Sequence, residues 1–203
     1  KMKRVIIVLF GLLLTTSAFA HPLPNLPKSL YTEGWRAGHI QGIAVDEKKG
    51  FVYYSFTTKL IKSDLAGNVV GSVDGLIGHL GCIDFCEADG KVYGSLEYKN
   101  DSIGKGILAQ EKIDRQWDTA FYVAIFDVNK IVRENMSAEK DGIMTTVYLP
   151  TVYQDFMAKV ESNGKTLEHR LGGIYLFFTA PGGLINHLSF LHSFISYKFL
   201  VNY

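Results

Sequence analysis

The sequence predicts an all-β fold, and three observations support this prediction. Residues 39–55 and 79–95 repeat each other, with identical residues at seven of seventeen aligned positions, where ordinary residue usage gives roughly one. Short runs rich in β-branched and aromatic residues alternate with Gly-containing turns, as in antiparallel hairpins. Four such strands fill a repeat of about forty residues, which is the size of one propeller blade. We therefore predict a partial β-propeller with about two full four-stranded blades and the start of a third.

The predicted strands follow the two repeats. In the first repeat they cover residues 40–45, 51–56, 59–63 and 69–73. The turn before residue 51 ends on Gly50, where a positive φ is convenient. The second repeat keeps the first hairpin, over residues 80–85 and 91–97, and continues with strands over 121–127 and 144–149. A third start is visible at His169, and a strand is expected over residues 174–179.

Two segments do not fit the strand pattern. Residues 98–120 are polar and strongly charged, and we expect a loop there. After Pro150, the apolar residues Val152, Phe156 and Val160 recur every four positions and are followed by Asn163-Gly164. This spacing predicts one short amphipathic helix with its C-cap, inserted between blades.

The two ends of the chain differ from the repeats. Residues 1–20 combine a basic start, a ten-residue apolar run and small residues at Ala18 and Ala20, which is typical of a secretory signal cleaved after Ala20. We expect a secreted or periplasmic protein whose propeller domain covers residues 21–180. Residues 181–203 form an atypical hydrophobic tail. The tail is interpreted as a membrane anchor, a buried strand pair or the product of a frame shift or premature end; its polar residues disfavour an anchor, and its abrupt change of composition favours the third interpretation.

Charge and cysteine content narrow the functional classes. The formal net charge is +1, from 21 basic and 20 acidic residues, which gives no basis for binding nucleic acid. Cys82 and Cys86 are the only cysteines. On an extended strand they stand about 13 Å apart, too far for a disulfide, so we expect free thiols.

The blade-start pattern resembles that of secreted propellers of the NHL and SMP-30 (gluconolactonase-like) superfamily. The residues that carry this likeness are His39-x-x-Gly42-Ile43-Ala44-Val45-Asp46, Gly50-x-Val52-Tyr53 and Lys62-x-Asp64-x-x-Gly67-Asn68-Val69. The resemblance covers residues 35–97 well, 121–149 loosely and 169–179 faintly. It implies an incomplete or truncated propeller, because closed rings protect strand edges and blade faces. Such a chain needs self-association, a partner or further sequence.

The first strand of each propeller blade lines the central channel, and this position selects the candidate site residues. They are His39, Gln41, His79, Asp84, Glu97 and His169. Alternatively, His39 and His79 are structural residues of the blade junction that bond a neighbouring turn. Gluconolactonase-like enzymes hold one divalent cation in the channel. The resemblance therefore implies a calcium or zinc ion, for which Asp84 is the one obvious carboxylate ligand.

Three functional hypotheses follow from these patterns. The first is a secreted propeller that binds a small molecule, a glycan or a protein without catalysis, because the sequence contains no recognisable catalytic motif. The second is a metal-assisted hydrolase or lactonase of the SMP-30 type. The third is a truncated remnant without independent activity. None of them requires a membrane span after signal cleavage.

Overall fold

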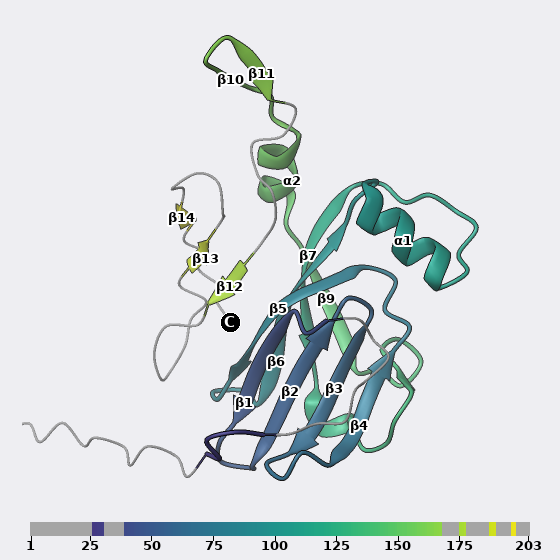
Figure 1. Ribbon diagram of the computed structural model, residues 1–203, viewed down its shortest axis with the longest axis vertical. Coiled ribbons are helices and arrows are strands. Elements are labelled where there is room, and N and C mark those ends of the chain that lie inside the picture. Colours follow the sequence, from purple (N-terminus) through teal and green to yellow (C-terminus); the bar gives the residue numbers. More distant parts are fainter. Residues whose placement is uncertain (1–25, 31–38, 168–174, 178–186, 190–195, 198–203) are drawn as a thin grey trace, which may run out of the picture.

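The computed structural model describes residues 26–30, 39–167, 175–177, 187–189 and 196–197. This part of the chain is mostly β-sheet, with two short α-helices, which agrees with the all-β prediction (Figure 1). The predicted signal segment, residues 1–20, and the candidate His169 lie outside the described residues. The described strands form open sheets that do not close into a ring.

The first sheet is an antiparallel meander built from the first repeat. Its strands are β1 (Gly42–Asp46), β2 (Phe51–Phe56), β3 (Lys59–Asp64) and β4 (Val69–Asp74). A short strand from much later in the chain, β8 (Met136–Ser137), pairs with β4 in parallel. The order in the sheet is therefore β1-β2-β3-β4-β8. Each of the first four strands lies within two residues of its predicted range.

The second sheet repeats this meander. Its strands are β5 (His79–Cys86), β6 (Lys91–Tyr98), β7 (Ala120–Phe126) and β9 (Met144–Tyr148). The repeated turns have the same geometry: the amide of Gly50 donates to the carbonyl of Asp46, and that of Gly90 to the carbonyl of Cys86, both at 2.8 Å. Gly50 and Gly90 have φ values of 70° and 68°, which favour Gly. The repeat in the sequence is therefore a repeat of structure.

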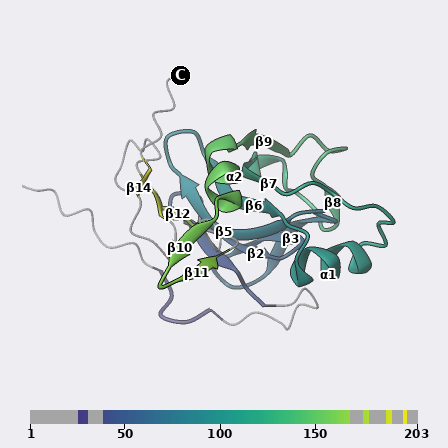
Figure 2. The ribbon, with the colours of Figure 1, turned by 90° about the horizontal axis from the view of Figure 1, so that it is seen from above.

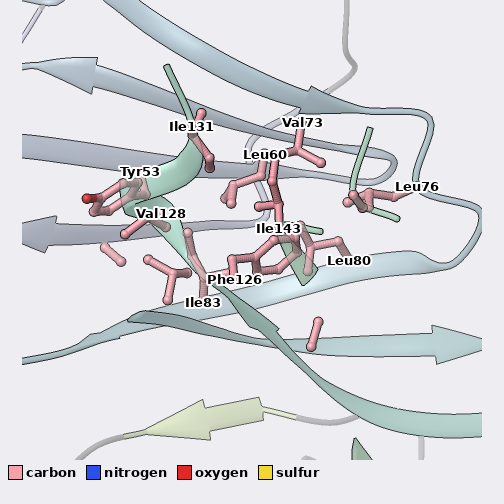
Figure 3. Packing of buried hydrophobic residues seen from close by; sticks show 14 of the residues in the cluster. Tyr53, Leu60, Val73, Leu76, Leu80, Ile83, Phe126, Val128, Ile131 and Ile143 are labelled. Carbon is pink, nitrogen blue, oxygen red and sulfur yellow. The ribbon is translucent and has the colours of Figure 1, made fainter. Parts of the chain in front are cut away.

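The two sheets pack face to face around the main hydrophobic core (Figures 2 and 3). The first sheet contributes Tyr53, Leu60 and Val73, and the second contributes Leu80 and Phe126. All five side chains are almost completely excluded from solvent. The connection after β7, which includes the 3₁₀ turn η1 (Val128–Lys130), closes the core from one side. Burial of apolar side chains from both sheets stabilises the pair.

The first strands of the two sheets, β1 and β5, lie side by side. Their backbones approach so closely at Gly42 that a Cβ atom there would lie 2.7 Å from the amide nitrogen of Ile83. Cys82 and Cys86, on β5, are free thiols as predicted.

A third, three-stranded sheet follows. It consists of β12 (Tyr175–Phe177), β13 (His187–Ser189) and β14 (Ser196–Tyr197), with β13 in the middle. β12 falls within the strand expected over residues 174–179, and it lies close to β5 and β6. The described residues of the predicted tail are therefore strand residues: β13 pairs with β12, and β14 pairs with β13. No helix within the described ranges is long and apolar enough to cross a membrane.

The prediction of a loop over residues 98–120 is wrong, because this segment contains α1 (Ser102–Gln110). Asp101 caps this helix: its side chain accepts a hydrogen bond of 2.9 Å from the amide of Gly104. An Asp side chain at the N-cap satisfies an amide that has no partner inside the helix.

The inserted helix exists, but its predicted end is wrong. α2 (Pro150–Met157) ends before Asn163-Gly164, and these two residues form the turn of a hairpin between β10 (Val160–Ser162) and β11 (Lys165–Leu167). Both have positive φ, 51° and 71°, as a type I′ hairpin turn requires. α2 covers the outer face of the second sheet, where the rings of Phe156 and Phe121 lie 5.1 Å apart.

Candidate functional site

Four of the six candidate residues come together at one end of the two sheets. We call this group, together with its neighbours Lys99 and Asp101, the histidine cluster. It consists of His39, Gln41, His79, Glu97, Lys99 and Asp101. The cluster forms because residues 39–41 precede β1, His79 opens β5 and Glu97 lies near the end of the neighbouring strand β6.

Gln41 holds His39 against the first sheet. Its side-chain amide donates to Nε2 of His39 at 2.9 Å and lies 3.4 Å from the hydroxyl of Thr57. Its backbone amide donates to the carbonyl of Ser55 at 2.8 Å. His39 itself is exposed, so its ring is positioned on one side and open to solvent on the other.

His79 and Glu97 are opposite each other on β5 and β6, and cross-strand partners share one face of a sheet. The Glu97 residue is only 6% exposed. Nζ of Lys99 lies 2.7 Å from Oε2 of Glu97 and 3.8 Å from a carboxylate oxygen of Asp101. A buried carboxylate is tolerated only with such a partner. Glu97 and Lys99 therefore form a nearly buried ion pair beside the imidazole.

The pKa of His79 is lowered from its ordinary value of 6.5, first because the ring is buried. The carboxylates of Glu97 and Asp101 oppose this shift, whereas Lys99 and His39 reinforce it. His79 is therefore neutral at neutral pH. Its Nδ1 atom is buried and has no hydrogen-bond partner in the part of the chain that the structure describes. A buried polar atom without a partner costs about 1–3 kcal/mol, and a ligand that reached Nδ1 after a local movement of the side chains that cover it would recover this cost.

Asp84 does not belong to the cluster. It lies five residues beyond His79 on β5, about 16 Å along an extended strand, and its carboxylate accepts from the backbone amide of Phe85 at 2.8 Å. Among the described residues, no three His, Cys, Asp or Glu side chains are placed to share a metal ion. The histidine cluster is therefore a group of hydrogen-bonding side chains, and Asp84 lies outside it.

Lys99 and Asp101 belong to the cluster but were not selected from the sequence. They fall in the segment for which a loop was predicted. The alternation of Glu97, Lys99 and Asp101 carried a usable signal, because residues two apart on an extended chain lie on the same side.

No protein-family model, curated protein or solved structure matches the chain. Its function must therefore be inferred from its own residues.

Proposed function

We propose that this chain belongs to a secreted β-propeller that binds a small polar ligand at the histidine cluster. Three features support the propeller. The sequence repeat coincides with two four-stranded meanders, these pack face to face, and the first strand of each sheet lies beside the first strand of the next, β1 beside β5 and β5 beside β12. Blades around a channel have this arrangement. The composition of residues 1–20 supports secretion.

The buried, unpartnered Nδ1 of His79 is the observation that carries the proposed ligand site. The neutral imidazole offers one donor and one acceptor, and the Gln41 amide lies in the same cluster. Glu97 and Lys99 balance each other's charge. The cluster therefore suits an uncharged ligand with hydroxyl or carbonyl groups, and it places no nucleophile beside the imidazole among the residues named here.

The test is thermal unfolding of the secreted protein with a panel of monosaccharides, sugar lactones and polyols, and separately with calcium and zinc chloride. A ligand at a hundred times its Kd adds about 2.7 kcal/mol of stability, or a rise in Tm of about 5–10 °C for a domain of this size. We expect one organic compound to give a saturable rise that His79→Phe and Glu97→Gln abolish. Asp84→Asn, on the same strand but outside the cluster, is the matched control and should keep the full rise.

Three outcomes would contradict this proposal. If no organic compound stabilises the protein, or if Asp84→Asn abolishes the rise as His79→Phe does, the histidine cluster is not the ligand site. Stoichiometric binding of calcium or zinc that Asp84→Ala abolishes would instead support the metal-assisted hydrolase hypothesis.

A further inference from the structure

A concave surface lies on the face of the second sheet opposite to the histidine cluster. Its volume is about 360 Å³, and we call it the aromatic groove; it is lined by Tyr98, Trp117, Asp118, Ala120, Tyr122 and Thr146. Tyr98 and Tyr122 pack against the core between the sheets, whereas Glu97, the residue before Tyr98, belongs to the histidine cluster. Successive side chains of a strand point to opposite faces. The groove and the cluster are therefore separate sites.

The aromatic rings of the groove are held in fixed positions. The ring of Tyr98 meets that of Trp117 edge to face, with centroids 5.2 Å apart and planes at 87°, and that of Tyr122 at 5.6 Å and 79°. The indole Nε1 of Trp117 donates to the carbonyl of Lys99 at 3.2 Å. Tyr148, 46% exposed, continues the row with its ring 5.3 Å from that of Tyr122. Such edge-to-face contacts order the rings before any ligand binds.

Side chains of negative and of positive charge lie near these rings. Asp118 and Thr146 are exposed at the groove. Burial raises the pKa of Tyr98, Tyr122 adds to this rise, and the guanidinium of Arg115 is close enough to oppose it. A cationic ligand would meet Arg115 and an anionic ligand would meet Asp118. A neutral ligand can donate hydrogen bonds to Asp118, which lines the groove, and avoids repulsion by either charge.

We propose that the aromatic groove binds a neutral saccharide. A sugar ring presents an apolar face of C–H groups, which packs on aromatic rings, and a rim of hydroxyl groups, which bond to carboxylate, hydroxyl and guanidinium groups. The volume lies at the lower end of the range for small-molecule sites, about 300–1,000 Å³, and suits a monosaccharide or disaccharide. This inference does not depend on the ligand of the histidine cluster.

The chain offers a direct optical probe of the groove. It contains two tryptophans, Trp35 and Trp117, so Trp35→Phe leaves the groove indole as the only one. In this background we would titrate glucose, galactose, mannose, N-acetylglucosamine and their disaccharides, with glucuronate and choline as charged comparators. We expect a saturable change of Trp117 fluorescence with at least one neutral saccharide and a much weaker response to both charged compounds.

Two neighbouring threonines on β9 supply matched variants. Thr145 and Thr146 are both exposed, but they pair with the successive residues Ile125 and Ala124 and so face opposite sides of the sheet. Thr146→Arg fills the groove, whereas Thr145→Arg places the same side chain outside it. We expect Thr146→Arg and Asp118→Ala to weaken the saccharide at least about tenfold, the scale of one lost ring or hydrogen-bond contact, and Thr145→Arg to leave it unchanged.

The variants also separate the two sites. Saccharide binding that survives His79→Phe but not Thr146→Arg belongs to the groove. The reverse pattern would assign the saccharide to the histidine cluster and overturn the inference, as would equal effects of Thr145→Arg and Thr146→Arg. The absence of any response to neutral saccharides, or a response to choline or glucuronate alone, would also overturn it.

Discussion

The close approach of β1 and β5 makes Gly42→Ala a sharp test of how the two sheets pack. A Cβ at residue 42 would lie 2.7 Å from the backbone nitrogen of Ile83 and 3.0 Å from Cα of Cys82, whereas ordinary contacts begin at 3.4 Å. Because both atoms are backbone, no side-chain rotation relieves the overlap, and the strands must separate by about 0.7 Å. Overpacking of this kind costs about 1–3 kcal/mol, which lowers Tm by about 2–12 °C in a domain of this size.

Gly106→Ala is the matched control, for which the expected change in stability has the opposite sign. Gly106 lies inside α1, and a Cβ there would have nothing within 4 Å. Alanine should therefore stabilise the protein by about 0.5–1 kcal/mol through its higher helix propensity. Both variants would be measured by thermal and urea unfolding followed by circular dichroism. If Gly42→Ala left stability unchanged while Gly106→Ala raised it, the contact between the first strands would not exist in solution.

Three other variants probe the core, the histidine cluster and the first helix. Leu60→Ala, at a side chain with no exposed surface in the core between the sheets, should cost about 2–5 kcal/mol in urea unfolding; a cost below 1 kcal/mol would contradict that packing. The folded protein holds the pKa of His79 below its unfolded value, so the unfolded chain takes up a proton first and stability should fall as pH drops through about 6.5. His79→Gln should flatten this part of a plot of urea midpoint against pH, and identical slopes would refute the assignment. Asp101→Ala removes the hydrogen bond to the Gly104 amide and should lower stability by about 1 kcal/mol, whereas Asp101→Asn, which keeps a capping oxygen, should cost less.

Most strands could be predicted because their boundaries are set by local chemistry. Gly50 and Gly90 permit the positive φ of the repeated turns, and β-branched and aromatic residues occupy the flanking strands. α1 was missed because Gly104 and Gly106 weaken its helical pattern. Its Gly104 is required by packing, since a Cβ there would collide with the carbonyl of Lys99, and no local pattern reveals a tertiary contact.

The end of α2 was misplaced for a different reason. Asn-Gly can follow a helix or turn a hairpin, and the choice depends on whether the flanking residues pair. Here Ser162 pairs with Lys165, so Asn163-Gly164 form the turn of a hairpin. In the candidate site, repetition identified His39 and His79, but the position of the Glu97–Lys99 pair beside His79 depends on the pairing of β5 with β6. That information is absent from either segment alone.

The backbone ladder of each four-stranded meander is complete within its own repeat. The two repeats join through the side chains of the core and through β8, which pairs with the edge strand β4. A gene that gained or lost one repeat would therefore keep the four-stranded ladders of the remaining repeats and change which faces and outer edges are covered. Tyr53 stacks on Phe85 of the following repeat with ring centroids 5.9 Å apart, and its counterpart Tyr93 lies on the next face along. A repeat added by tandem duplication therefore already carries a face that packs against the preceding repeat. Whole repeats are the units by which this protein could be lengthened by design.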